Sequence, residues 1–177
     1  MIRFIAIPLL SFLVLLGCTP GEDQDGEKEN SNTSTWKSST VDLNVIPEND
    51  NTAYMTRLDK FCWEKDREEA CNLSPRDPRD IAEDLPPILV SKNEEIGLQH
   101  DYLTQDLPEP DHYTVTQFGP GDEEGIQVEV IKEGKERPKI LAPKEPGKYY
   151  YLVHIEWTEE EVGEAYYAFY FTVRNDS

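Results

Sequence analysis

Three histidines and many carboxylates are the residues of this chain best suited to chemistry. A Ser-His-Asp hydrolase needs a nucleophile on a strained turn with a base in reach, and its usual signature, Gly-x-Ser-x-Gly, does not occur. A metal centre could in principle gather ligands from this set, but no two histidines have the H-x₃₋₅-H spacing of a zinc site. The candidates for such a centre are His100, Asp101, Asp111, His112, His154 and Glu156.

Strand phase gives two of these histidines a simpler role. His100 falls on the inward phase of its segment, where a core position is expected, and His154 falls on the outward phase beside Glu156, where a solvated pair is expected. A glycosidase needs two acids flanking a cleft, and the 36 acidic residues of the chain single out no such pair. We therefore predict a protein that is not an enzyme, with no catalytic residues, no metal and no cofactor.

The beginning of the chain predicts where the protein resides. Arg3 is followed by an apolar run over residues 4–16, which is too short to span a bilayer but fits the apolar region of a secretory signal. Gly17 and Cys18 follow directly, and this arrangement resembles the bacterial lipobox. The resemblance implies that residues 1–17 are a lipoprotein signal peptide and that Cys18 carries the lipid. The expected location is the extracytoplasmic face of the cell membrane; an accidental cysteine after an ordinary signal would instead give a secreted protein.

The chain contains three cysteines. If Cys18 is lipidated, Cys62 and Cys71 are an even pair in an oxidising compartment, which favours a disulfide. Such a bond closes a loop of about ten residues and contributes on the order of 3 kcal/mol. Two free buried thiols and half of a metal site are the alternatives, although no further Cys or His lies close by in the sequence.

The composition limits both partners and domains. The net charge of −19 argues against nucleic acid, which requires basic patches, and favours a soluble surface of low adhesion. Residues 18–40 are rich in Glu, Asp, Ser, Asn and Thr, and we expect this stretch to be a disordered tether because it cannot bury enough apolar surface to fold. The remaining residues, 41–177, are long enough for one domain with its own core.

Alternation with period two dominates that domain and predicts an all-β fold. About seven short strands separated by Gly and Pro turns are typical of an antiparallel sandwich. One short helix is expected from Pro78, with Asp77 as its N-cap. The apolar alternating segments are 41–45, 88–90, 96–102, 113–118, 126–130, 140–142, 149–157 and 167–173.

The stretch Glu145-Pro146-Gly147-Lys148-Tyr149 opens the longest expected strand. It resembles the tyrosine corner of immunoglobulin-like domains, in which a tyrosine hydroxyl bonds to backbone a few residues upstream. Tyr149 would be that tyrosine, and Tyr151 would stand where antibody domains have a cysteine. An ordinary turn before an aromatic strand is the alternative.

A wider resemblance rests on the residues Phe61-Cys62-Trp63, Cys71, Ala142-Pro143, Pro146-Gly147-Lys148-Tyr149, Trp157 and Tyr167-Ala168-Phe169. With these residues, the stretch 54–175 is similar to a group of small surface lipoproteins from bacillus-type Gram-positive bacteria. The resemblance implies an immunoglobulin-like fold and an extracytoplasmic location, and it implies no reaction.

A possible binding surface comes from the phase opposite to the core. Tyr150, Tyr166 and Tyr170 share that phase, and exposed aromatics are typical of binding surfaces, unless the short helix or another segment covers them. We therefore hypothesise a non-catalytic binding or display module whose partner is an unknown protein or a cell-wall glycan. The alternative is an inhibitor or accessory subunit of an envelope enzyme or transporter, which would act through the loop 119–125 or the acidic tip 159–161.

Overall fold

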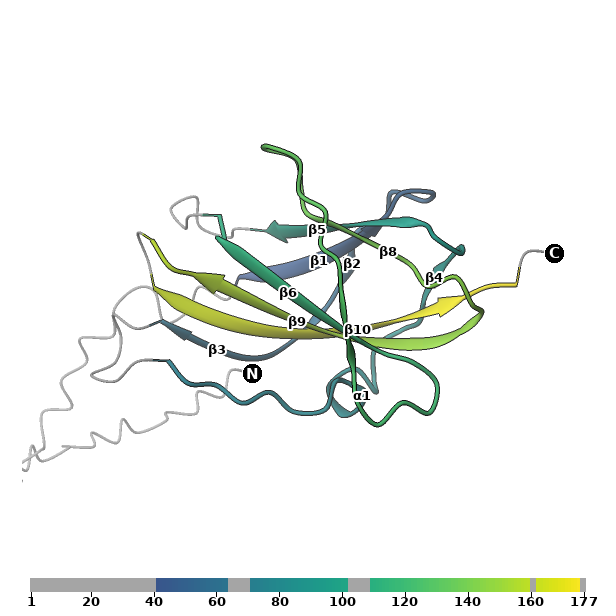
Figure 1. Ribbon diagram of the computed structural model, residues 1–177, viewed down its shortest axis with the longest axis horizontal. Coiled ribbons are helices and arrows are strands. Elements are labelled where there is room, and N and C mark those ends of the chain that lie inside the picture. The colour runs from purple at the N-terminus through teal and green to yellow at the C-terminus, as the bar shows by residue number, and fades with distance from the viewer. Residues whose placement is uncertain (1–40, 64–70, 102–108, 160–161, 176–177) are drawn as a thin grey trace, which may run out of the picture. The chain divides into compact units, whose positions relative to one another are not determined.

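Two β-sheets and one short helix make up the regular structure in the computed structural model, which describes residues 41–63, 71–101, 109–159 and 162–175 (Figure 1). The mostly β prediction is confirmed, although these ranges contain ten strands and not seven. The strands are β1 (Asp42–Pro47), β2 (Tyr54–Met55), β3 (Arg57–Trp63), β4 (Ile88–Val90), β5 (Glu95–Asp101), β6 (His112–Phe118), β7 (Ile126–Val128), β8 (Lys139–Leu141), β9 (Gly147–Trp157) and β10 (Gly163–Val173); the helix is α1 (Pro78–Ile81).

The first sheet has four antiparallel strands in the order β2-β1-β5-β8. β1 is an inner strand of this sheet, because the two-residue strand β2 pairs with its outer side. Leu43 and Val45 of β1 face the core together with Ile96 and Leu98 of β5, as their alternation predicts. The alternate residues of these strands, such as Ile46 and Gly97, lie on the opposite, outer face of this sheet.

The second sheet is larger, and its main path runs β3-β10-β9-β6-β7. Its two longest strands, β9 and β10, pair in antiparallel register along their whole length. The outer edge of β10 is shared, because β3 pairs with its first half and β4 pairs with its end. The contact between β4 and β10 is parallel, whereas the other strand pairs are antiparallel.

One hydrophobic core lies between the two sheets, since a single cluster of buried side chains draws on both of them. The second sheet supplies most of the bulk, and Tyr151 stacks on Phe169 with ring centroids 5.0 Å apart. Trp63 and Trp157 pack against each other at 4.8 Å near one end. Burial of each such large apolar side chain stabilises the fold by about 1.5–3 kcal/mol. The described residues all belong to one compact unit, residues 33–177.

The helix begins as its sequence predicts. The Asp77 side chain accepts a hydrogen bond from the Arg79 backbone N–H at 2.8 Å, and Pro78 occupies the first turn. Ile81 and Ala82 then pack on the outer face of the second sheet, against Ala168 and Tyr170 of β10. This smaller cluster holds α1 against that face.

The predicted cysteine pair lies at disulfide distance, with Cys62 and Cys71 Sγ atoms 2.00 Å apart. The bond ties the end of β3 to the segment that leads to α1. The predicted lipid attachment at Cys18, the signal peptide 1–17 and the tether 18–40 lie outside the described residues, as does most of the acidic tip 159–161. Among the described residues, no helix has the length and apolar character that a membrane span requires.

Candidate binding site

The three tyrosines expected on one exposed face do not form such a face. Tyr170 is only 7% exposed because α1 and the residues after it cover it, and its hydroxyl donates to the Leu85 carbonyl at 3.0 Å. Tyr150 is half-buried beside it, with ring centroids 5.4 Å apart. The expectation is therefore corrected at Tyr170, because the short helix, one of the segments that could cover this face, does cover this residue.

Tyr166 lies farther along the same face and belongs to a closed polar network. Its ring stacks on His154 with centroids 4.2 Å apart, and burial, followed by the charge of Glu164, raises the pKa of its hydroxyl. His154 Nε2 and Glu164 Oε2 lie 2.9 Å apart, and the other Glu164 oxygen accepts the Leu73 N–H at 2.9 Å. The main partner of His154 is thus Glu164, and Glu156, its expected partner, is 4.0 Å away.

The other two histidines, His100 and His112, do not join His154 in a metal centre within the described ranges. His100 is on the inward side, as expected, where its ring lies 5.6 Å from that of Tyr113 and 6.4 Å from that of Trp157. His112 is exposed at the start of β6. Within the described ranges, no three His, Cys, Asp or Glu side chains are grouped closely enough to hold a metal ion.

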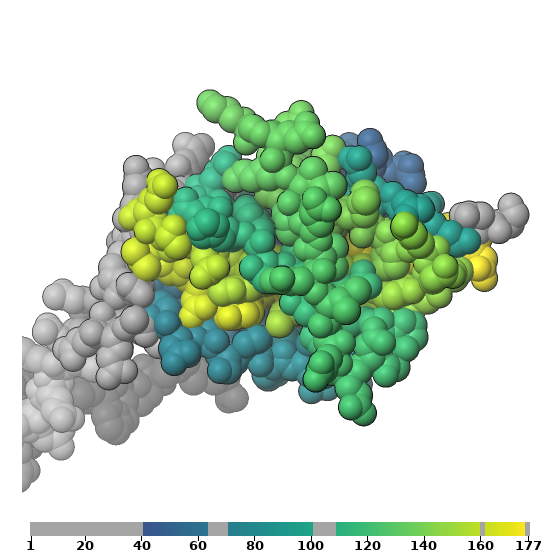
Figure 2. Space-filling view, viewed as in Figure 1, coloured from purple at the N-terminus to yellow at the C-terminus, as the bar shows by residue number. Residues whose placement is uncertain are grey.

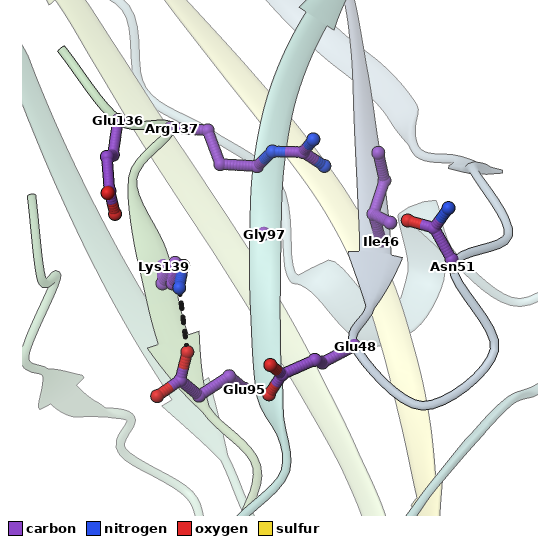
Figure 3. A pocket seen from close by; sticks show the side chains of 8 residues that line it. All are labelled: Ile46, Glu48, Asn51, Glu95, Gly97, Glu136, Arg137 and Lys139. Atoms are coloured by element: carbon purple, nitrogen blue, oxygen red, sulfur yellow. Dashed lines mark hydrogen bonds and ion pairs between the residues drawn. The ribbon is translucent and has the colours of Figure 1, made fainter.

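A hollow of about 360 Å³ opens instead on the outer face of the first sheet (Figure 3). Gly97 of β5 forms its floor, between Ile46 of β1 and Lys139 of β8, which are its direct neighbours across the sheet. The missing side chain at Gly97 makes the depression. The lining residues are Ile46, Glu48, Asn51, Glu95, Gly97, Glu136, Arg137 and Lys139.

Arg137 lies across that floor. A Cβ atom at Gly97 would be 2.5 Å from the Arg137 Cδ atom, so the arginine stem occupies the space that any other residue at this position would need. Figure 3 shows the guanidinium extending over Gly97 toward Ile46. Arg137 follows a turn in which Gly134 has a φ of +57°, a left-handed conformation that favours glycine. This turn belongs to the segment between β7 and β8, which stands clear of the body in Figures 1 and 2.

Both signs of charge meet in this hollow. Lys139 Nζ lies 2.8 Å from Glu95 Oε2, and this hydrogen bond raises the pKa of the lysine. Arg137, Glu48 and Glu136 form no hydrogen bond or ion pair with the side chain of any described residue. A guanidinium presents paired donors that fit a carboxylate, and a carboxylate accepts from an ammonium group or a hydroxyl. The arrangement can therefore recognise a small polar molecule that carries both an acidic and a basic or hydroxyl group.

The amino-acid sequence alone does not predict this hollow. Its residues come from three segments that are far apart in the chain and meet only through strand pairing. One signal was present: a glycine inside an alternating strand often marks a place where another group approaches the backbone closely. Gly97 has that role here.

The loop expected to serve the alternative function is well anchored. Asp122 accepts the Gly119 N–H at 2.9 Å through its side chain, and its carbonyl accepts Arg79 Nη1 at 2.9 Å. The Arg79 guanidinium also lies 5.5 Å from the centroid of the Phe118 ring. The loop 119–125 is thereby held to α1.

Comparison of the chain with protein families, with curated proteins and with solved structures finds no match.

Proposed function

We propose that this protein is a lipid-anchored, extracytoplasmic binding module with an immunoglobulin-like domain, and that it acts without catalysis. Cys18 would carry the lipid, as the resemblance to bacillus-type surface lipoproteins implies. The hollow above Gly97 would hold the ligand. The observation that carries this proposal is a pair of charged side chains that no described side chain hydrogen-bonds or ion-pairs, Arg137 on one side of the hollow and Glu48 on the other.

The strand order supports the immunoglobulin-like part of the proposal. In chain order, β5, β6, β7, β8, β9 and β10 fit strands B, C, C′, E, F and G, with β1 in the place of A. The first sheet then contains A-B-E, with β2 added beside A, and the second contains C′-C-F-G, with β3 and β4 added beside G; no described strand fits D. Tyr149, near the start of β9, donates its hydroxyl to the Glu145 carbonyl at 3.1 Å, which is the hydrogen bond of a tyrosine corner at the E–F connection.

The ligand class follows from the charges. We expect a cell-wall fragment that carries a carboxylate and an amino group, such as a short peptide or an amino sugar. Its carboxylate would bind Arg137, and its amino group would bind Glu48 or Glu136. Because the chain as a whole is strongly acidic, with a net charge of −19, a purely anionic polymer would be repelled while a mixed-charge ligand would be admitted.

The test is a titration of solubilised cell-wall fragments into the chain expressed from residue 18 with Cys18→Ser. Arg137→Gln should weaken binding at least about ten-fold, because a charge-assisted hydrogen bond contributes roughly 1.5–3 kcal/mol. Lys135→Gln removes the same charge from an exposed residue of the neighbouring turn and serves as the control. Equal affinities for the two variants would reject the hollow as the site.

The inhibitor function is supported by one observation, the anchoring of the loop 119–125 through Arg79. A loop held in one conformation loses little entropy when it enters a protease cleft. A protease panel assayed with the wild-type chain and with Arg79→Gln separates the two functions. Inhibition that weakens in this variant would favour the alternative.

A further inference from the structure

We propose that a second site, an apolar groove of about 510 Å³, binds a free single-chain carboxylate such as a fatty acid. The apolar body of the ligand would lie in the groove, and its carboxylate would bind Arg57. This groove is separate from the hollow above Gly97 and shares no residue with it. Its lining is Ala53, Tyr54, Met55, Thr56, Arg57, Leu85, Pro86, Ile88, Phe169 and Tyr170.

The groove results from the way in which the chain changes sheets. β2 pairs in the first sheet and β3 in the second, with Thr56 between them. On the outer edge of β10, pairing with β3 ends at Ala168 and pairing with β4 begins at Phe171. Phe169 and Tyr170 therefore pair with no described strand on that edge, and the groove opens there.

Most of the lining is apolar, and Met55 at its rim is 69% exposed. A large exposed apolar side chain beside a groove of this size fits the usual character of a small-molecule site, which is mostly apolar with few polar groups. The volume is within the common range of about 300–1,000 Å³ for such sites. Apolar surface of this kind favours the hydrocarbon part of a ligand.

The polar groups of the lining are already engaged, with one exception. The Tyr54 hydroxyl donates to Asp50 at 2.7 Å, the Thr56 hydroxyl donates to the Leu43 carbonyl at 2.7 Å, and the Tyr170 hydroxyl donates to the Leu85 carbonyl. Within the described ranges, the Arg57 side chain makes no hydrogen bond or ion pair, and it is the only charged side chain in the lining.

This single cation determines the chemistry of the ligand. An apolar groove alone would accept neutral, cationic and anionic amphiphiles equally. An exposed guanidinium at the rim favours a carboxylate and opposes a cationic head group. On a protein with a net charge of −19, that local positive charge is also what allows an anion to approach.

The test uses decanoate, decanol and decyltrimethylammonium as probes, each below its micelle concentration. The protein is the ¹⁵N-labelled chain from residue 18 with Cys18→Ser, and backbone amide shifts are followed by NMR. We expect saturable binding of decanoate, with the largest shifts at Ala53, Met55 and Phe169. Decanol should bind more weakly than decanoate, and the ammonium compound should bind weakest.

Two variants and a control assign the site. Arg57→Gln should weaken decanoate at least about five-fold and leave decanol unchanged, since it removes only the charge-assisted bond. Ala53→Trp replaces an exposed residue and should fill the groove, so that both probes lose binding. Arg137→Gln should leave decanoate binding intact, because Arg137 lines the hollow and not the groove. A failure of decanoate to bind the groove is therefore distinguishable from a failure of cell-wall fragments to bind the hollow.

Three results would overturn the proposal: no saturable decanoate binding, the largest shifts away from the groove, or equal loss of decanoate and decanol in Arg57→Gln. Phosphatidylglycerol vesicles distinguish a free carboxylate from a bilayer lipid. We expect them not to displace decanoate, and displacement would contradict the assignment to a free single-chain ligand.

Discussion

Replacing both Cys62 and Cys71 with alanine should lower the free energy of unfolding by about 3 kcal/mol. The two residues are nine positions apart, so the bond closes a loop of about ten residues. The loop-entropy relation for a loop of this length gives about 2.7 kcal/mol at 25 °C. Alanine avoids placing a hydroxyl at Cys62, which is only 3% exposed.

The folded state should survive this change, because other contacts hold the same segment. Leu73 N–H donates to Glu164 at 2.9 Å, and Arg76 Nε lies 2.6 Å from Asp59 Oδ1. The loss of stability therefore comes mainly from the freer unfolded chain and not from a rearranged native structure.

Urea unfolding followed by tryptophan fluorescence measures the effect, since Trp63 and Trp157 pack together in the core. The wild-type chain under reducing conditions should match the double variant, which makes it the internal control. A decrease below about 1 kcal/mol would refute the reasoning, because the loop term alone exceeds that value. A double variant with the same urea unfolding curve as the oxidised wild-type chain would also refute it.

Three further predictions concern the packing of β9 and β10. Tyr149→Phe removes the bond to the Glu145 carbonyl and should lower the unfolding free energy by about 1 kcal/mol, whereas Tyr150→Phe, whose hydroxyl bonds to no described residue, should be near neutral in the same urea titration. Burial raises the pKa of Tyr151 above its ordinary value near 10, so the stability that the neutral Tyr151 contributes is fully present below about pH 10 and is lost as the pH rises further. Tyr151→Phe should therefore make the decline of Tm at alkaline pH less steep. An unchanged slope of Tm against pH would count against this reasoning. Gly163→Ala should cost roughly 1–3 kcal/mol, because the new Cβ would lie 2.7 Å from a backbone carbonyl of β3; a variant with wild-type Tm would contradict this packing.

Local chemistry in the sequence predicted much of the fold. Alternation located the long strands and their core-facing residues, because a half-buried strand must place every second side chain in the core. Asp77 and Pro78 located the helix, and the offset from Glu145 to Tyr149 predicted a hydrogen bond that the structure contains. Each of these signals lies within a few residues of the feature it predicts.

The remaining features depend on contacts between distant segments. Alternation shows that Tyr170 is on the outer phase of β10, but not that a helix some 90 residues earlier in the chain packs on it. The inner position of β1 depends on a two-residue strand, β2, which is too short to show any periodicity. The hollow above Gly97 likewise needs β1, β5 and the segment before β8 to meet, and pairing of that kind leaves no local pattern.

The central claim, that the hollow binds a mixed-charge ligand through Arg137, is tested most directly by one comparison. Solubilised cell-wall fragments are titrated calorimetrically into the chain from residue 18 with Cys18→Ser, carrying in turn no further change, Arg137→Gln or Lys135→Gln. We predict that Arg137→Gln alone weakens binding, by at least about ten-fold, while its thermal stability matches that of the control. Identical binding curves for all three proteins would contradict the account.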